Sequence, residues 1–395
     1  MRVTRTDALL LRGLYLLAAG IVCFQVLGME ALVSALFTGT FFLTGFLWLS
    51  AARRAVDEND LLAYGIIVLA FANVCLNAWL TGAEITGGYF KKLVMFAVTV
   101  LYLTTAGKLR ADAALRAFLA RLNDAVAVFL TGALILARRE MYMLNGQLSG
   151  YLTFRFSNPN FTGMLLVCVA MLEAARLFAP GRRAEKGLRL LLCACLAFFV
   201  YETRSRSALL VLCGFALACL WLRLTRRSRF RIRGWAAAAA AGFPLVFALL
   251  YLPLIRGAWV RRVLSFLAGE GKRLTSRAAI WSFALRRYLS SPILGAYSQI
   301  RSGTGHVQMH NTHVDLLASY GPAVLVGVCV LLYRLLRQAD AARKSDFVFL
   351  LGFLCCLALG AGEAALFSGG LGIYLFAGGF LLLADAPPEE AEVCA

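Results

Sequence analysis

Residues suited to acid–base or metal chemistry are scarce in this chain. Its 395 residues include three histidines, and 21 acids stand against 40 lysines and arginines. The sequence contains no Asp-x-Asp pair and no glycine loop of the Walker type. It therefore lacks the usual marks of a metal-dependent nucleotide-sugar site and of a nucleotide-hydrolysing motor. Any activated donor would have to arrive through the membrane with its leaving group already attached.

Cysteine is absent from the segments that we expect to face the outside. Ten of the eleven cysteines lie in apolar stretches, and Cys394 is the exception. This distribution argues against a disulfide framework and against a thiolate metal site. We interpret the cysteines as small buried apolar residues.

Apolar runs dominate what is present. The composition is 61% hydrophobic, with a mean hydropathy of +0.76, and stretches of about 20 apolar residues recur along the chain, as membrane-spanning helices require. We predict an all-α polytopic integral membrane protein that forms a single domain over residues 1–395, with about twelve transmembrane helices. The predicted spans are roughly 9–28, 31–50, 61–81, 90–107, 118–137, 161–179, 188–203, 207–224, 234–255, 313–336, 346–364 and 367–385.

Basic residues predict the orientation of these spans. Lysine and arginine cluster on alternate sides of the spans, in the loops near 53–54, 108–116, 182–186, 223–233 and 334–344. By the positive-inside rule, this side and both termini are cytoplasmic. The net charge of +19 then reflects membrane orientation, so we expect no nucleic-acid partner. The segment 256–312 becomes a large external loop before the tenth span.

That external loop is the first candidate for chemistry. It carries nine lysines and arginines against one acid, Glu270, and all three histidines lie at or just past its end. An amphipathic stretch from Ser276 to Leu289 predicts a helix lying at the membrane interface. The histidines are His306, His310 and His313.

The histidine spacing of four and then three residues allows two chemical interpretations. Three imidazoles on one helical face could bind zinc, although Gly303 and Gly305 disfavour a helix that starts before His306. A general base is the better use, because imidazole titrates near neutral pH and can accept a hydroxyl proton. The structural alternative is that these histidines simply begin the tenth span. We expect no metal site.

Two shorter external segments carry arginines. In the turn Tyr201–Ser207, Arg204 and Arg206 lie at the membrane edge, where they could snorkel or pair with Glu202. Equally, they could hold a lipid-linked phosphate, which the planar guanidinium suits. In the other segment, Asn160 follows Pro159 and is expected to cap the sixth span, while Arg155 lies just before it.

Five motifs in order resemble the O-antigen ligase/polymerase superfamily. They are Asn158-Pro159-Asn160-Phe161-x-Gly163, Thr203-x-Ser205-Arg206, Arg277-x-x-x-Trp281, Pro292-x-x-Gly295, and His310-Asn311 followed by Gly321. Each motif is weak alone, but the order and the expected topology make the resemblance fairly specific.

The resemblance implies a fold and a reaction. The fold is GT-C-like, and the enzyme is a metal-independent, cofactor-free, inverting glycosyltransferase. It implies an undecaprenyl-diphosphate-linked glycan as donor and a saccharide or lipid-linked glycan as acceptor. Arg206 and Arg277 would bind the diphosphate, and His310 would be the base. Further substrate-binding candidates are Arg204, Asn311, Asn160 and Arg155.

Ligases attach the glycan to a lipid A-core sugar, and polymerases attach it to another glycan repeat; the sequence leaves both open. We expect a bacterial cytoplasmic-membrane enzyme with an external active site, in contact with membrane lipid and with other polysaccharide-assembly proteins. A transporter of small anions such as bicarbonate is the alternative. Transporters usually place polar residues at mid-membrane, on broken helices. Here Asp124 and Glu173 are the acids that we place clearly inside spans, and the charge is concentrated at the external face, which disfavours a transporter. A non-catalytic scaffold is a third interpretation.

Overall fold

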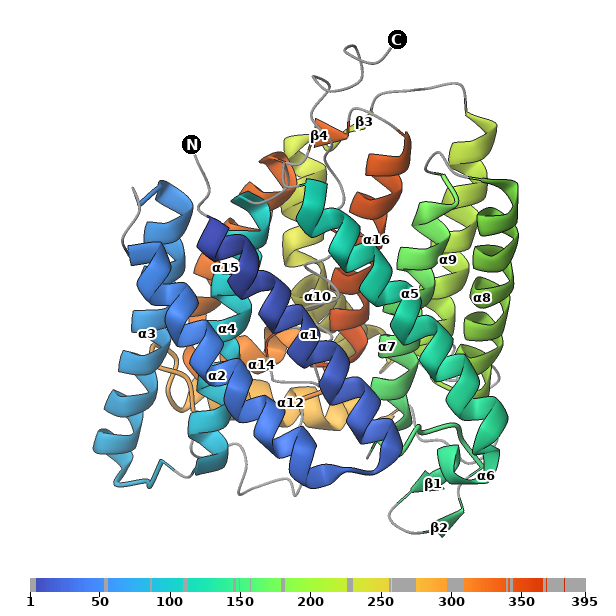
Figure 1. The fold of residues 1–395 in the computed structure, drawn as a ribbon. Helices are drawn as coiled ribbons and strands as arrows, with labels where there is room; N and C mark the ends of the chain where they lie inside the picture. The colour runs from blue at the N-terminus through green and yellow to red at the C-terminus, as the bar shows by residue number, and fades with distance from the viewer. Residues whose placement is uncertain are drawn as a thin grey trace.

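A computed structural model shows a bundle of helices (Figure 1). It describes residues 5–52, 56–85, 87–108, 113–144, 147–148, 150–156, 158–178, 182–225, 230–255, 257, 275–296, 309–338, 340–341, 344–364, 367 and 380. The longer helices are α1 (Arg5–Leu27), α2 (Glu30–Ala52), α3 (Glu58–Thr81), α4 (Gly87–Lys108), α5 (Ala113–Leu136), α7 (Pro159–Arg176), α8 (Arg183–Glu202), α9 (Arg206–Leu224), α10 (Gly234–Leu254), α15 (Pro322–Gln338) and α16 (Lys344–Gly362). The shorter helices and the two-residue strands are α6 (Arg138–Met141), α12 (Thr275–Leu289), α14 (Thr312–Tyr320), β1 (Met143–Leu144), β2 (Gln147–Leu148), β3 (Phe230–Arg231) and β4 (Asp340–Ala341).

The helical class predicted from the sequence is confirmed, and the protein is a membrane protein. Among the described residues, five helices are long and apolar enough to cross a membrane. They are Thr6–Leu27, Glu58–Thr81, Ala114–Leu136, Arg206–Leu224 and Gly234–Leu254. Helices also occupy the other predicted spans up to residue 364, with one correction described next. The twelfth predicted span, 367–385, lies almost wholly outside the described residues.

The predicted tenth span is two helices instead of one. Helix α14 ends at Tyr320 and α15 begins at Pro322, with Gly321 between them at a φ of 85°. Proline is well suited to a first helical position but cannot continue the helix before it. The sequence prediction of one continuous helix over 313–336 was therefore wrong at this point.

The short connections gather at opposite ends of the bundle. Helix α6, the β1–β2 pair and α12 lie toward one end, and the β3–β4 pair and the start of α1 lie toward the other (Figure 1). Antiparallel pairing of Phe230 with Ala341 joins the connection after α9 to the connection after α15. These two basic connections therefore share one end, as the charge pattern predicts.

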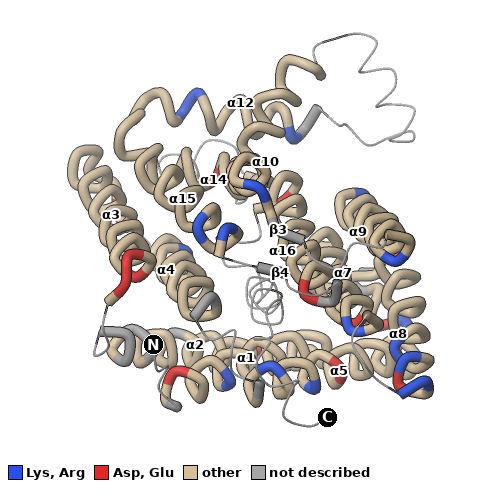
Figure 2. The backbone as a smooth tube through the Cα atoms, turned by 90° about the horizontal axis from the view of Figure 1, so that it is seen from above, with Lys and Arg blue, Asp and Glu red and all other residues tan. Residues whose placement is uncertain are grey.

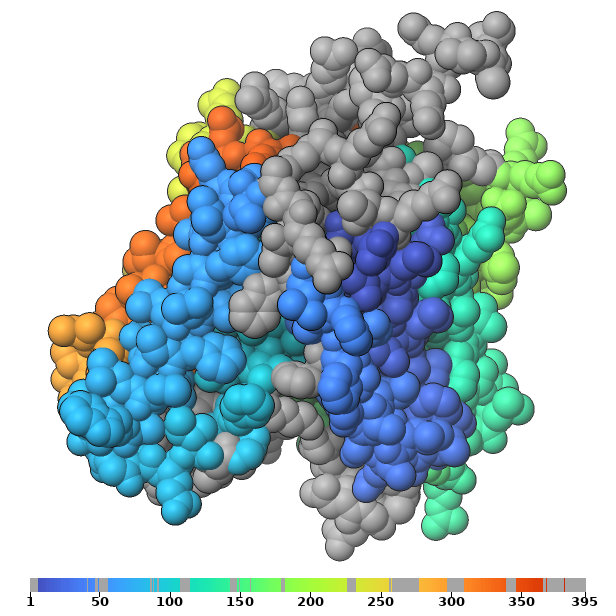
Figure 3. Space-filling model, turned by 60° about the vertical axis from the view of Figure 1, so that its left-hand side comes forward, coloured from blue at the N-terminus to red at the C-terminus, as the bar shows by residue number. Residues whose placement is uncertain are grey.

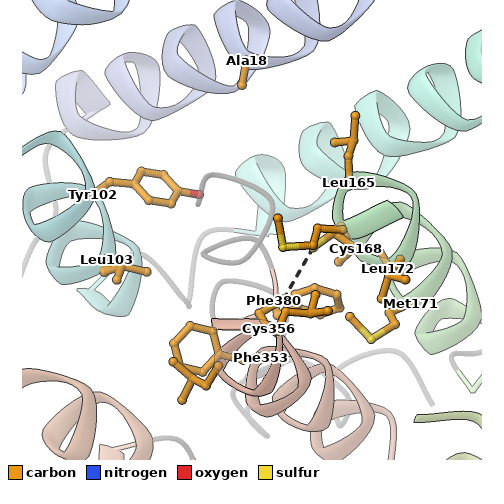
Figure 4. Close-up of a cluster of buried hydrophobic side chains, with 14 of the residues drawn as sticks. Ala18, Tyr102, Leu103, Leu165, Cys168, Met171, Leu172, Phe353, Cys356 and Phe380 are labelled. Atoms are coloured by element: carbon orange, nitrogen blue, oxygen red, sulfur yellow. Dashed lines mark hydrogen bonds between the residues drawn. The ribbon is translucent and has the colours of Figure 1, made fainter. Parts of the chain in front are cut away.

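Helix α16 lies near the middle of the molecule when the bundle is viewed along its length (Figure 2), packed against α7, α9, α10 and α14. Where α16 meets α7, the Sγ atoms of Cys168 and Cys356 lie 3.7 Å apart among buried aromatic rings (Figure 4). Both cysteines are buried and unpaired, as expected, whereas Cys75 and Cys213 are exposed on helix faces.

The outer faces of the bundle are apolar. On α3, for example, the exposed side chains include Leu61, Val68 and Trp79. This helix belongs to the face built from α1 to α4 that Figure 3 shows. Exposed leucine and tryptophan on long helices are expected where lipid replaces water as the solvent.

An ion cluster fastens α5, α7 and α8 together. Arg189 Nη1 lies 2.7 Å from Glu173 Oε2 and 2.6 Å from Asp124 Oδ1. Arg176 contacts the same two carboxylates, at 3.6 Å from Glu173. Glu173 is fully buried, so its charge needs these partners. The cluster accounts for both acids inside the spans, Asp124 and Glu173, without a transport role.

Candidate functional site

The carboxylate of Glu363 is where the candidate site converges. Glu363 directly follows α16 and is fully buried. Its Oε1 accepts hydrogen bonds from Arg277 Nη2 at 2.7 Å and from Asn160 Nδ2 at 2.9 Å. Its Oε2 lies 2.7 Å from Nδ1 of His310. Three residues singled out from the sequence, on three separate segments, therefore meet at one acid.

Arg277 reaches Glu363 from the first turn of α12. One helical turn later, Trp281 is buried and stacks edge-on against Tyr251 of α10, at a ring separation of 5.4 Å. The Trp281 indole N–H donates to the carbonyl of Met309 at 2.8 Å. The Arg-x-x-x-Trp spacing puts both side chains on one helix face, so the tryptophan seats the helix and the arginine points to the acid.

His310 adopts the left-handed backbone conformation, with a φ of 50°. Among the described residues, four non-glycine residues do so: Phe154, Arg155, Arg204 and His310. Three of the four are site candidates from the sequence. Such conformations cost about 1–3 kcal/mol and gather at functional sites, where the surrounding structure enforces them.

Asn311 fixes the segment that carries His310. Its Oδ1 accepts from the backbone N–H groups of His313 and Val314 and so caps α14. Its Nδ2 donates to the carbonyls of Ala361 at 3.0 Å and Pro244 at 2.8 Å. Asn311 is fully buried, and these contacts favour a positioning role over the predicted substrate contact, which stays a prediction.

The predicted cap on α7 is one of the corrections. Asn158, not Asn160, is the N-cap, because its Oδ1 accepts the Asn160 N–H at 2.9 Å. Pro159 then occupies the first helical position, which its fixed φ suits. The Asn160 side chain is left to donate to Glu363. The sequence prediction chose the wrong asparagine because either residue could cap the same turn.

The start of α9 lies beside this cluster. A Cβ placed on Gly362 would lie 3.3 Å from Ser207 Cβ and 3.4 Å from Arg277 Nη1. Gly163 likewise brings α7 close to the turn before α9, because a Cβ placed on Gly163 would lie 2.7 Å from Ser205 Cβ. The hydroxyls of Ser205 and Ser207 are buried without a hydrogen-bond partner among the described residues. Arg206 lies between these two serines and begins the helix.

The described contacts of Arg204 and Arg155 are with residues other than Glu363. Arg204 lies over the ring of Tyr151 at 5.5 Å, and Glu202 accepts a hydrogen bond from the Tyr142 hydroxyl at 2.6 Å. Arg155 donates to the carbonyl of Leu27 at 3.0 Å and pairs with Glu140. No contact among the described residues joins Arg155 to Glu363.

A cleft opens beside this turn. Burial and the hydrogen bond to Glu202 raise the pKa of Tyr142 to about 12, so the phenol stays protonated and donates to the carboxylate. The cleft has a volume of about 450 Å³ and is lined by Arg138, Arg139, Tyr142, Leu148 and Glu202.

Two motif glycines seat the turn that follows α12 against the break between α14 and α15. A Cβ on Gly295 would lie 2.8 Å from Gly321 N, and one on Gly321 would lie 2.2 Å from Ile293 O. Both glycines have positive φ, at 79° and 85°. Asn77 of α3 holds the turn further by donating to Gly295 O at 2.7 Å. These motif residues therefore support the site without touching it.

The histidines face different partners. His313 is buried in the first turn of α14, and its Nε2 donates to Ala241 O at 2.7 Å. His310 lies against Glu363. His306 lies outside the described residues. Within the described part of the chain, no group of three histidine, cysteine or acidic residues is placed to hold a metal ion.

Glu363 is the residue that reasoning from the sequence missed. It falls at the end of the predicted span 346–364, yet that reasoning counted Asp124 and Glu173 alone as clear acids within spans. The signal was available, because an ionisable residue in an apolar segment is a functional candidate in its own right. Asp315 was overlooked in the same way. It is buried in α14 and pairs with Lys92 at 2.7 Å.

Residues 191–329 match the family model described as O-antigen ligase. The resemblance seen in the motifs is therefore confirmed over this segment, which includes Arg206, Arg277 and His310. Asn160 and Glu363 lie outside the matched residues. No curated protein matches the chain. Together with the apolar helices, the match supports an O-antigen ligase-type membrane function, and the family implies lipid-linked glycans as substrates.

Proposed function

We propose that the protein is a membrane glycosyltransferase that moves an undecaprenyl-diphosphate-linked glycan onto a saccharide acceptor. One observation carries the proposal above all: His310 and Arg277 contact opposite oxygens of the same buried carboxylate. A base and a cation held this close suit a reaction that deprotonates one oxygen while another leaves with negative charge.

Arg277 and Arg206 form the diphosphate clamp in this proposal. The guanidinium of Arg277 uses Nη2 for Glu363, and its five N–H donors leave others for phosphate. The start of α9 adds support, because helix N-termini favour anions and the Ser205 and Ser207 hydroxyls are buried there without partners among the described residues. Stabilising the leaving charge is worth roughly 3–4 kcal/mol by analogy with oxyanion-hole donors.

His310 acts as the base. Its Nδ1–H donates to Glu363 in the tautomer that leaves Nε2 unprotonated. The acceptor hydroxyl gives its proton to Nε2 as its oxygen attacks the anomeric carbon, and the bond to the diphosphate oxygen breaks with its electron pair. Attack opposite the leaving group inverts the anomeric centre. Such base catalysis contributes roughly 10²–10⁴-fold, and no step needs a metal.

The remaining candidates take secondary positions in this proposal. Asn160 orients Glu363, and Arg204 and Arg155 lie on the same end of the bundle, where the acceptor or the donor glycan would extend. The site faces the outside of the bacterial cytoplasmic membrane, both termini are cytoplasmic, and about twelve helices in a GT-C-like arrangement surround it. The acceptor decides between ligase and polymerase. A lipid A-core sugar defines a ligase, and a second lipid-linked repeat defines a polymerase.

Anion transport is not favoured. The helix break at Gly321 and the two prolines within α10, Pro244 and Pro253, are features that transporters also use. However, the carbonyls at these breaks accept hydrogen bonds from protein side chains, such as Asn311 Nδ2 at Pro244 O. The family match also points to a transferase.

The test compares two histidines three residues apart. His310→Ala should abolish transfer while the protein level stays normal, because loss of a base costs orders of magnitude in rate. His313→Ala should mainly lower the yield of folded protein, since it deletes a buried hydrogen bond to Ala241. Surface-glycan laddering is read in a strain that lacks the chromosomal gene. Near-normal laddering with His310→Ala would overturn the proposal.

A further inference from the structure

Glu363 carries an inference of its own, which rests on the proposed glycosyl transfer. We propose that Glu363 is a positioning residue: its ionised carboxylate fixes the His310 ring, balances the imidazolium that forms during transfer, and ties the base to Arg277. The three contacts that define it run to His310, Arg277 and Asn160, at 2.7, 2.7 and 2.9 Å.

The location of this acid is costly for a residue with only a packing role. Its side chain is fully buried, and taking a carboxylate out of water costs several kcal/mol unless partners compensate. It also follows the last residue of α16, where the helix dipole disfavours negative charge. The Arg277 cation offsets part of this cost at Oε1, but a glutamine could also accept from Asn160 and Arg277, so the choice of an acid needs a reason at Oε2.

His310 supplies the reason. The carboxylate accepts the Nδ1–H and so selects the tautomer whose Nε2 can take a proton. When the acceptor hydroxyl gives its proton to Nε2, the ring becomes cationic, and Glu363 lies in hydrogen-bond contact with that charge. In this role Glu363 orients the ring and balances its charge, and it takes no proton from the ring.

The second oxygen links the base to the clamp. Arg277 keeps a third of its side chain exposed while Nη2 binds the buried Oε1, so Glu363 sets the plane of the guanidinium and leaves its other edge for phosphate. Asn160 shares the same oxygen and limits how far the carboxylate can rotate. The side chain of Glu363 therefore fixes the position of the donor-binding Arg277 relative to the proton-accepting His310.

The experiment is a double-mutant cycle on the full-length protein. Purified variants are mixed with membranes from a strain lacking the gene, which supply the cell's own donor and acceptor, and transfer is expressed per folded molecule. Glu363→Gln should lower the rate at saturating membrane about 100-fold or more, the order seen when a base loses its orienting carboxylate. In the His310→Ala background the same change should cost nothing further, because the two residues act as a unit.

Two further variants separate positioning from stability. Glu363→Asp keeps the charge but shortens the side chain, so it should recover at least tenfold over Glu363→Gln. If Glu363→Gln does not accumulate as folded protein, Glu363→Asp decides alone, with an expected loss of about tenfold. Glu58→Gln removes an exposed ion pair with Arg334 and should leave transfer unchanged.

The outcomes distinguish this inference from the proposed function. Activity that survives His310→Ala would remove the base and the function built on it. Loss with His310→Ala but full rate per folded molecule with Glu363→Gln, or with Glu363→Asp where Glu363→Gln does not fold, would overturn the role of Glu363 alone. Equal, additive losses in both backgrounds would also overturn it, since they would show that Glu363 acts independently of His310.

Discussion

Trp281 donates its indole N–H to the carbonyl of Met309, the residue immediately before His310. One hydrogen bond thus joins the helix that carries Arg277 to the segment that carries His310. The two residues that form this 2.8 Å contact are buried. The placement of Arg277 relative to His310 therefore depends on this hydrogen bond.

Trp281→Phe should lower transfer about tenfold with little loss of folded protein. Phenylalanine keeps most of the ring packing against Tyr251 and Phe247 but leaves the Met309 carbonyl without its donor, which costs about 1–3 kcal/mol. Rates per folded molecule are compared with Trp235→Phe, because Trp235 is largely exposed. Equal rates for the two variants would contradict the prediction.

Gly295→Ala and Gly321→Ala should each prevent accumulation of folded protein. Both positions have positive φ, and the added Cβ would meet backbone atoms within 2.8 Å at Gly295 and 2.2 Å at Gly321. Gly82→Ala is the matched control, because its φ is 66° but nothing lies within 4 Å of the new Cβ. It should cost only the left-handed strain of about 1–2 kcal/mol. The yield of folded protein and its thermal unfolding in detergent are compared for the three variants. Similar losses of stability in all three would show that the steric contacts at Gly295 and Gly321 are unimportant.

Arg206→Lys and Arg277→Lys should each reduce donor turnover at least tenfold at a normal protein level. An ammonium keeps the charge but cannot offer two parallel N–H donors to a phosphate. Arg182→Lys, at the exposed start of α8, provides the control. If both test variants turned over donor as fast as the control, the clamp would have to be placed elsewhere.

Transfer should survive removal of divalent metal. The proposed steps use His310, Arg206 and Arg277, and within the described residues the ring nitrogens of His310 and His313 contact Glu363 and Ala241. Activity is measured after treatment with EDTA and again after zinc is added back. Loss that zinc restores would replace the general base with a metal site, for which His306 would be the first residue to examine.

The segment 256–312 should be reachable from outside the cell. The prediction rests on the alternating basic loops and on the position of α12, at the opposite end from the β3–β4 pair (Figure 1). A single cysteine at Ser302, in a background lacking the native cysteines, is treated with an impermeant maleimide. Labelling in intact cells is expected, and labelling that requires permeabilised cells would reverse the orientation.

The sequence predicted most helices because apolar length alone specifies them. It also singled out His310, Arg277 and Asn160, which meet at Glu363, since each belongs to a motif with fixed spacing. It did not find the break at Gly321, because the apolar run continues through Pro322 and hydropathy does not register a change of helix. It chose Asn160 over Asn158 as a cap, because local propensity does not separate two asparagines in one turn.

Glu363 was missed for a different reason. No motif contains it, and 53 residues separate it from His310, so only tertiary packing makes them neighbours. The same holds for Asn311, whose motif position gave no sign that its side chain caps α14 and also binds Pro244 and Ala361. Contacts between distant segments carry the chemistry of this site, and patterns read along the chain do not encode them.

The order in which the chain is synthesised gives the junction at Asn311 a further consequence. Arg277, His310 and Asn311 leave the ribosome before α16 does, and the carbonyl of Ala361 and the carboxylate of Glu363 arrive only with that helix. Nascent chains fold from the N-terminus onward, so most of the bundle is made while His310 still lacks its contact with Glu363. If the proposed mechanism holds, the site is therefore incomplete until α16 has docked, and we expect an unfinished chain to transfer no glycan.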